Sequence, residues 1–203
     1  MIGELESLTA RARALAGRGE RAILGIAGAP GGGKSTLASA LVAELGDAAV
    51  LVPMDGFHLA QAELVRQGIR DRMGAPHTFD ARGYVALLRR LRAAEETVYA
   101  PAFRREIEEP IAGAIAVPPE VPLVVTEGNY LLLWDEVREL LNEAWYVEMD
   151  EETRLRWLIQ RHIDFGKTPD AARAWVMRSD QANAAVSAAT RERGDVVVRL
   201  AVG

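Results

Sequence analysis

The feature of this sequence that most restricts its fold is a glycine-rich segment, GAPGGGKS, at residues 28–35. It matches the pattern G-x-x-x-x-G-K-S, in which backbone N–H groups gather around phosphate oxygens. Glycine adopts the backbone angles of such a loop at little cost, the lysine reaches the β- and γ-phosphates, and the serine hydroxyl ligates Mg²⁺. The segment therefore predicts a nucleoside triphosphate and Mg²⁺ site, made by Gly28, Ala29, Pro30, Gly31, Gly32, Gly33, Lys34, Ser35 and Thr36.

The neighbourhood of this segment distinguishes it from an ordinary glycine-rich turn. The apolar run Ala22–Gly28 predicts a strand before it, and leucines at 37, 41 and 45 predict a helix from Lys34 that stops at Gly46. Lys34 is one of only two lysines in a chain that otherwise uses arginine. A compact ammonium suits a phosphate loop better than a planar guanidinium, and we expect Lys34 to lie on the solvent side of the loop.

Strands and helices alternate along the rest of the chain. Apolar runs at 48–54, 121–126, 144–149 and 195–202 predict four more strands, and periodic segments at 82–94, 151–165 and 169–187 predict helices. Residues 97–118 contain prolines and predict irregular or hairpin structure. The alternation predicts an α/β fold of the P-loop NTPase class, with a five-stranded parallel sheet, helices on both faces and a small helical lid at about 151–170. The length favours one domain, 1–203.

Composition excludes several classes of protein. The chain has no cysteine, which excludes disulfides and thiolate sites and is consistent with a cytoplasmic location. A net charge of −5 opposes nucleic-acid binding, and no apolar run reaches the ~18–20 residues that span a membrane. The expected partner is therefore a small-molecule substrate, with the chain a monomer or a homodimer.

Two carboxylates follow predicted strands and are candidates for chemistry beside the P-loop, as we call residues 28–35. Asp55 follows the second strand and Glu127 ends the third. Ligands of parallel sheets bind beyond the carboxyl ends of the strands, so both should face one crevice. Asp55 could accept the proton of a substrate hydroxyl while Glu127 holds the metal or its water shell. Alternatively, Asp55 caps a turn and Glu127 is a surface acid.

The segments GAPGGGKST, PMDGFH, RMGAPHTFD, YAPAF, EGNYLLL and RLRWLIQRHIDFGKTPDAA together identify a family resemblance. The chain resembles the phosphoribulokinase, uridine kinase and bacterial pantothenate kinase superfamily, and within it the bacterial fructose transport system kinase-like (nucleoside kinase-like) subgroup. The resemblance implies ATP-dependent phosphorylation of a hydroxyl, with Asp55 as the general base. One departure concerns the acceptor: relatives commonly carry F-D-R where this chain has Phe103-Arg104-Arg105.

The same resemblance implies a set of residues around the two substrates. It places lid arginines in the segment 151–170, where we favour Arg161 as the catalytic arginine and Arg154 as a second ATP contact. Both would share one helix face, with Trp157 between them, and a merely solvated face is the alternative. Acceptor contacts are expected from His58, Arg70, Arg72, His77, Tyr99, Arg105 and Asn129.

The expected function is an ATP- and Mg²⁺-dependent phosphotransferase that acts on a hydroxyl of a sugar, a nucleoside or a pantothenate-like metabolite. Two alternatives stay open. The chain could be a nucleotide-binding regulatory protein or NTPase, although the N-K-x-D segment of Ras-type GTPases is absent from the sequence. It could also be a nucleoside monophosphate kinase, for which the arginines near residue 70 would bind the acceptor phosphate. The sequence leaves the acceptor undetermined.

Overall fold

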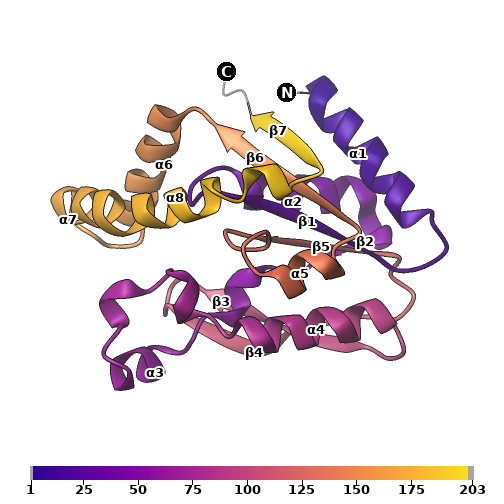
Figure 1. The fold of residues 1–203 in the computed structure, drawn as a ribbon, viewed down its shortest axis with the longest axis horizontal. Helices are drawn as coiled ribbons and strands as arrows, with labels where there is room; N and C mark the ends of the chain where they lie inside the picture. Colours follow the sequence, from indigo (N-terminus) through magenta and orange to yellow (C-terminus); the bar gives the residue numbers. More distant parts are fainter. Residues whose placement is uncertain (1, 201–203) are drawn as a thin grey trace.

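The computed structural model describes residues 2–200, and a parallel β-sheet forms its centre (Figure 1). Its five strands lie in the order β2-β5-β1-β6-β7, and each neighbouring pair is parallel. The predicted α/β class and five-stranded parallel sheet are confirmed. β1 carries the P-loop at its carboxyl end and occupies the middle of the sheet. The strands are β1 (Ala22–Gly28), β2 (Ala49–Leu51), β5 (Leu123–Gly128), β6 (Glu143–Met149) and β7 (Val196–Leu200).

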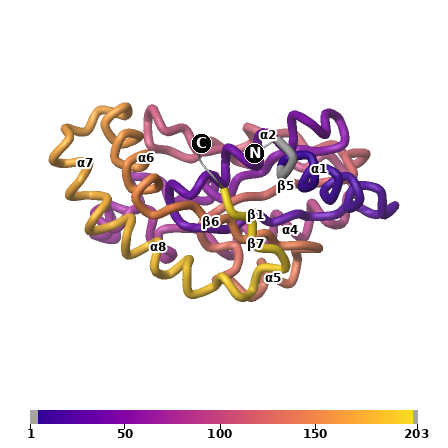
Figure 2. The backbone as a smooth tube through the Cα atoms, turned by 90° about the horizontal axis from the view of Figure 1, so that it is seen from above, coloured from indigo at the N-terminus to yellow at the C-terminus, as the bar shows by residue number. Residues whose placement is uncertain are grey.

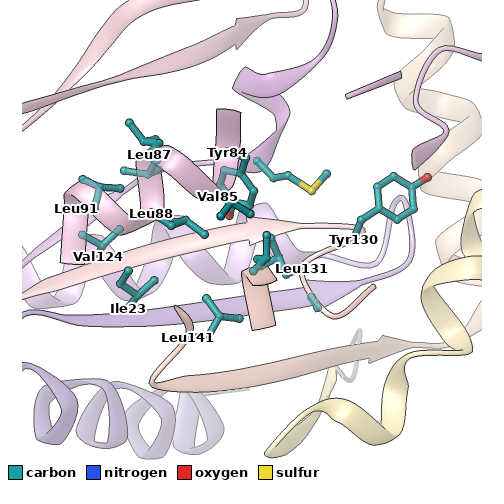
Figure 3. Close-up of a cluster of buried hydrophobic side chains, with 14 of the residues drawn as sticks. Ile23, Tyr84, Val85, Leu87, Leu88, Leu91, Val124, Tyr130, Leu131 and Leu141 are labelled. Carbon is teal, nitrogen blue, oxygen red and sulfur yellow. The ribbon is translucent and has the colours of Figure 1, made fainter. Parts of the chain in front are cut away.

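Helices cover both faces of the sheet because its central strands are apolar on both sides. All seven residues of β1 are buried, and its apolar side chains alternate between two hydrophobic clusters. Ile23 packs in the cluster formed with α4 (Ala81–Ala93) and α5 (Asp135–Leu140), which Figure 3 shows around Leu88 and Leu141. Leu24 packs on the other face, with α1 (Ile2–Ala16) and α2 (Lys34–Leu45). This period-two alternation is what a strand requires.

The strand that leads to Asp55 is shorter than the sequence predicts. Residues 48–54 were expected to form it, but β2 covers only Ala49–Leu51. Val52 donates one more hydrogen bond to Val125 at 2.8 Å, and Pro53, which has no N–H, then ends the pairing. The chain turns at once into a 3₁₀ turn, Met54–Phe57, that carries Asp55.

The prediction of a hairpin within residues 97–118 is confirmed. β3 (Val98–Arg104) and β4 (Glu109–Val117) pair antiparallel, with a change of register at Pro101. The hairpin packs on the turn that carries Asp55, where a Cβ on Gly56 would lie only 2.4 Å from the Pro101 carbonyl oxygen. Glycine is therefore required for this approach. The contact brings the β3–β4 connection close to Asp55.

Helices α6 (Glu151–Asp164), α7 (Pro169–Trp175) and α8 (Gln181–Ala188) follow β6. Figures 1 and 2 show α6 and α7 at the end of the molecule that lies away from α1. Thr168 caps the amino end of α7, where its side chain accepts a hydrogen bond from the N–H of Ala171. The prediction of one continuous helix over 169–187 is wrong in one respect, because a π-helical turn, Val176–Asp180, separates α7 from α8. The short helix α3 (Gln61–Arg66) was not predicted.

None of the helices that the structure describes within residues 2–200 has the length and apolar character needed to cross a membrane.

Candidate active site

The P-loop joins the buried strand β1 to the first turn of α2. Gly31 and Gly33 have φ angles of 75° and 83°, in the left-handed region that side chains disfavour. A Cβ at Gly33 would also lie 2.6 Å from the side chain of Leu200, so any larger residue would clash there. The loop thus places the amino end of α2, with its unpaired N–H groups and partial positive charge, at the edge of a cavity.

Lys34 is buried rather than on the solvent side of the loop, with only 6% of its surface exposed. Its Nζ donates hydrogen bonds to the carbonyl oxygen of Ala29 at 2.9 Å and to Oδ1 of Asn129 at 2.8 Å. Burial lowers the pKa of Lys34 to about 8, although the negative charges of Glu127 and Asp55 oppose the shift. An ammonium so desolvated gains strongly from a bound anion.

Ser35 and Glu127 meet across the carboxyl ends of β1 and β5. The Ser35 hydroxyl donates to Oε1 of Glu127 at 2.9 Å. Burial, and then the nearby charge of Asp55, raise the pKa of Glu127, against the effect of Lys34 and of the serine hydrogen bond. Hydroxyl and carboxylate oxygens are the ligands that Mg²⁺ prefers, and a bound cation would favour the ionised form of this buried carboxylate. These two residues therefore fit a magnesium ion.

Asp55 forms an ion pair with Arg105, which lies in the β3–β4 connection. The distance from Nη2 of Arg105 to Oδ2 of Asp55 is 2.9 Å. Burial alone would raise the pKa of Asp55. The charges of His58, Arg105 and the lysine and arginine across the cavity, Lys34 and Arg161, outweigh burial and hold that pKa below its ordinary value. Asp55 is therefore ionised at neutral pH, while the pKa of Glu127 shifts the other way.

His58 is held beside Asp55 by its own backbone and by two aromatic rings. Its Nδ1 lies 2.8 Å from the carbonyl oxygen of Asp55, and its ring centroid lies 4.0 Å from that of Phe79 and 4.6 Å from that of Phe103. A carbonyl oxygen only accepts hydrogen bonds, so Nδ1 carries the proton of this contact. In the neutral imidazole, Nε2 is then an acceptor available to a hydroxyl group in the cavity.

The two arginines expected on the lid occupy different environments. Arg161 lines the cavity, where burial and the charge of Arg105 lower its pKa against the effect of Asp180, Asp55 and Glu127. Arg154 does not line this cavity; it is only 6% exposed and lines a smaller cavity on the other side of Gly32. Its Nη1 donates to the carbonyl oxygen of Pro30 at 3.1 Å, and its Nη2 donates to Gln181. Arg154 thus supports the P-loop from behind.

The cavity has a volume of about 790 Å³ and is bounded by the P-loop, the turn at Asp55, the β3–β4 connection and α6. Of the expected acceptor contacts, it brings together His58, Arg70, Arg105 and Asn129. It does not bring in Arg72, His77 or Tyr99, which lie on the surface. Tyr99 is 61% exposed because it alternates in β3 with the buried residues Val98 and Ala100.

Several residues of the cavity are not among the site residues that the sequence predicted. They come from α3, from the segment that follows it, from the hairpin and from α6 to α8, and only the folded chain brings them together. These residues are Gln61, Asp71, Met73, Gly74, Phe103, Glu108, Trp157, Leu158, His162, Lys167, Trp175, Asp180 and Asn183.

Comparisons with known proteins agree with this geometry. The model of the Phosphoribulokinase / Uridine kinase family matches residues 23–201. ATP-dependent kinase-like protein notR′ of Aspergillus versicolor is 37% identical over 133 residues, which are 60% of this chain and 77% of that protein. A Schizosaccharomyces pombe protein provisionally named a uridine kinase is 32% identical over 179 residues, 81% of this chain and 76% of that protein.

A solved structure extends the similarity to nearly the whole fold. The crystal structure of a protein from Silicibacter sp. TM1040, provisionally named a fructose transport system kinase, superposes with a TM-score of 0.84 at 36% identity. The superposition covers 95% of this chain and 98% of that one. From the family match, these relatives and the P-loop geometry, we conclude that the chain belongs to the phosphoribulokinase/uridine kinase family and is a small-molecule kinase with an ATP-binding P-loop.

Proposed function

We propose that this kinase transfers the γ-phosphoryl group of ATP to a hydroxyl group of a small metabolite bound in the cavity beside the P-loop. The observation that carries the proposal is the presence of the ionised Asp55 and the buried ammonium of Lys34 in one cavity. Its volume of about 790 Å³ lies within the range of small-molecule sites, about 300–1,000 Å³. A single kinase domain over residues 1–203, with a lid at about 151–170, is part of the same proposal.

A second cavity, of about 380 Å³, supports a place for the rest of the nucleotide. It adjoins the P-loop at Ala29 and Gly32 and continues past the end of β6 to Arg191. With the phosphates on the N–H groups of the P-loop, the ribose and base would extend into this second cavity. The acceptor would then occupy the larger one, on the side of Asp55.

Magnesium would be held by Ser35 and Glu127 in this arrangement. When bound, it would supply positive charge to the phosphate oxygens. The residues of the chain provide the remaining electrostatic support: Lys34 reaches the phosphates, and Arg161 neutralises charge that develops on the transferring group.

Asp55 would orient the acceptor hydroxyl and take its proton. Arg105 engages Oδ2, so Oδ1 is the carboxylate oxygen best placed to accept that proton. Nε2 of His58 could accept a hydrogen bond from a second hydroxyl of the same substrate. Both features favour a polyhydroxylated or hydroxyl-bearing acceptor, such as a sugar, a nucleoside or a pantothenate-like compound.

The two other functions have less support. A nucleoside monophosphate kinase needs cations for the acceptor phosphate, but Arg66 pairs with Glu63 on the surface, Arg72 lies outside the cavity, and Arg70 bonds to Gln61. A regulatory NTPase needs no acceptor pocket beside the γ-phosphate, whereas this cavity extends well beyond the P-loop.

ATP depletion in the presence of a panel of sugars, nucleosides, nucleoside monophosphates and pantothenate tests the proposal. We expect consumption of ATP to rise with one acceptor class and a phosphorylated product to accumulate in equal amount. Consumption that is the same with and without every metabolite would instead favour the regulatory NTPase.

Ser35→Ala is expected to change the Mg²⁺ requirement specifically. Removing the hydroxyl deletes a metal ligand and a hydrogen bond to Glu127, so the Mg²⁺ concentration for half-maximal activity should rise. Ser39→Ala, at an exposed position of the same helix, is the matched control. An Mg²⁺ titration that coincides with that of the unmodified protein would remove Ser35 from the metal site.

Arg161→Ala is expected to lower kcat more than it raises the KM for ATP, because the contact strengthens as charge develops during transfer. Arg156→Ala, on the exposed side of α6, should leave both constants unchanged. Arg154→Ala should act differently, through the P-loop carbonyl that it supports, and raise the KM for ATP. Equal or larger loss of kcat in Arg154→Ala would transfer the catalytic role to Arg154.

A further inference from the structure

Two adjacent residues that follow α7 hold helix α6 at two places. Oδ2 of Asp180 accepts a hydrogen bond from Nε2 of His162 at 2.8 Å, and Oε1 of Gln181 accepts one from Arg154. His162 and Arg154 lie two turns apart on α6. The intervening residue Leu158 is buried between them. The helix that carries Arg161 is therefore fixed along its length to the start of α8.

The backbone at this point departs from a regular helix. The N–H of Gln181 bonds to the carbonyl oxygen of Val176, five residues back, which closes a π-helical turn. Such turns are uncommon and occur frequently at functional sites. Here the turn presents a carboxylate that is only 8% exposed and lines the cavity. Asp180 is thus a buried charge that the roles assigned above leave unused.

Three groups interact with this carboxylate, one through a hydrogen bond and two through its charge. His162 is its hydrogen-bond partner, and the ring of Trp175 lies edge-on to the imidazole with ring centroids 6.5 Å apart. Arg161 lines the same cavity as Asp180, and the charge of Asp180 opposes the lowering of the arginine's pKa by burial. Tyr130 is the third, and burial together with the charge of Asp180 raises its pKa. Tyr130 donates its hydroxyl proton to the carbonyl oxygen of Gly74.

We propose that Asp180 is a positioning residue for phosphoryl transfer, which acts through His162 to hold α6 so that Arg161 faces the transferring phosphoryl group. The proposal rests on the proposed function. His162 follows Arg161 directly in α6, so a rotation or shift of the helix at His162 displaces the guanidinium as well. Displacements of this kind are costly, since a misplacement of about 1 Å in an active site can lower the rate by about 10²-fold.

Asp180→Asn is the sharpest variant, because it keeps the shape of the side chain but replaces the carboxylate that accepts from His162 with a neutral amide, whose hydrogen bond is weaker. We expect kcat to fall by about 10- to 100-fold and the KM values for ATP and for the acceptor to stay within about twofold. Asp170→Asn, an exposed acid in the first turn of α7, is the matched control and should leave kcat unchanged.

A second measurement separates positioning from a general structural role. In an Arg161→Ala background, Asp180→Asn should cause little further loss of kcat, because the group that it positions is already gone. Amide hydrogen exchange over residues 154–164 should become faster in Asp180→Asn than in Asp170→Asn, without any need for an acceptor. Together these results would establish that the contact between Asp180 and His162 holds α6 and that it acts on the rate through Arg161.

Three results would overturn the proposal. The first is a kcat of Asp180→Asn equal to that of the unmodified protein, even if hydrogen exchange becomes faster. The second is a raised KM for the acceptor at unchanged kcat, which would make Asp180 a direct substrate contact. The third is an equal loss of kcat with and without Arg161. If the unmodified protein phosphorylates no acceptor, it is the proposed function that fails. Hydrogen exchange in Asp180→Asn then still reports whether Asp180 holds α6.

Discussion

Lys34→Met is expected to lower kcat by about 10³-fold or more, the order of effect seen when a cation on the transferring phosphoryl group is lost. Methionine keeps the apolar stem of the side chain and removes only the ammonium. The two oxygens that the ammonium bonds, from Ala29 and Asn129, belong to groups at the edge of the cavity and can be solvated there. Initial rates at saturating ATP and acceptor provide the measurement.

The same substitution should not destabilise the protein at pH 7. Burial lowers the pKa of Lys34 to about 8, so the folded state disfavours the ammonium relative to the unfolded chain. Because the pKa of Lys34 is lower in the folded protein than in the unfolded chain, its positive charge lowers the free energy of unfolding at every pH below about 8. This destabilisation disappears as the pH rises from about 8 to about 10.4, the pKa of lysine in an unfolded chain. The Tm of Lys34→Met at pH 7 is therefore expected to equal or exceed that of the unmodified protein.

Two further results test this account of Lys34. Bound phosphate raises the pKa of the ammonium again, so the affinity for MgATP should fall as the pH rises through about 8. Lys34→Arg keeps the charge but replaces a compact ammonium with a larger, planar guanidinium, and this variant should also lose most of the activity. Normal turnover in a folded Lys34→Met would contradict the assignment of this loop to ATP.

The sequence predicts those parts of the site that depend on local chain geometry. The bounds of α2, Lys34–Leu45, follow from the glycines before it, the leucine spacing and Gly46, and the structure agrees with them. Asp55 and Glu127 were expected in one crevice because they follow parallel strands. The structure places both beside Lys34, since the carboxyl ends of β2, β5 and β1 are adjacent in the sheet.

Other parts depend on packing between distant segments and leave no local pattern. Tyr99 was expected at the acceptor, but in β3 it lies on the face of the hairpin that is open to solvent. Successive residues of a strand point to opposite faces, and the sequence does not indicate which face of the hairpin is covered. The ion pair of Asp55 with Arg105 depends on the hairpin docking on Gly56. The burial of Arg154 depends on carbonyl and amide partners from the P-loop and α8.

The π-helical turn is a case in which tertiary structure overrides local propensity. Residues 169–187 have the composition and periodicity of one helix, with a proper N-cap at Thr168. Nothing in that pattern indicates an extra residue in one turn. The position of Asp180 against His162 depends on that extra residue, so a site residue of the cavity stays invisible until the backbone is known.

Asp55→Asn is expected to lower kcat by about 10²- to 10⁴-fold, the usual contribution of a general base. Asparagine has the same shape and can still accept a hydrogen bond from a hydroxyl, but it cannot take the proton. The ionised carboxylate is in place at neutral pH because the basic groups around it, first His58 and Arg105, hold the pKa of Asp55 below its ordinary value despite its burial. Asp47→Asn, at an exposed position before β2, is a matched control that should leave kcat unchanged.

The affinity for ATP should change little in Asp55→Asn, because the P-loop and Ser35 are intact. The free energy of unfolding of Asp55→Asn should be slightly lower than that of the unmodified protein at pH 7, because the pKa of Asp55 is lower in the folded protein than in the unfolded chain, which stabilises the protein at neutral pH. This stabilisation is lost as the pH falls through the pKa that Asp55 has in the folded protein. The difference in Tm between the variant and the unmodified protein should therefore shrink in acid.

Three measurements on this variant distinguish the roles that Asp55 could have. A large loss of kcat with an unchanged nucleotide Kd in Mg²⁺ supports a group that orients and deprotonates the acceptor. A weaker nucleotide Kd in Mg²⁺ but not in EDTA would assign Asp55 to the metal instead. A clear loss of Tm with nearly normal kcat would make its ion pair with Arg105 a structural link between the turn and the hairpin. Because Asp55 and the buried ammonium of Lys34 line the same cavity, we expect the first result.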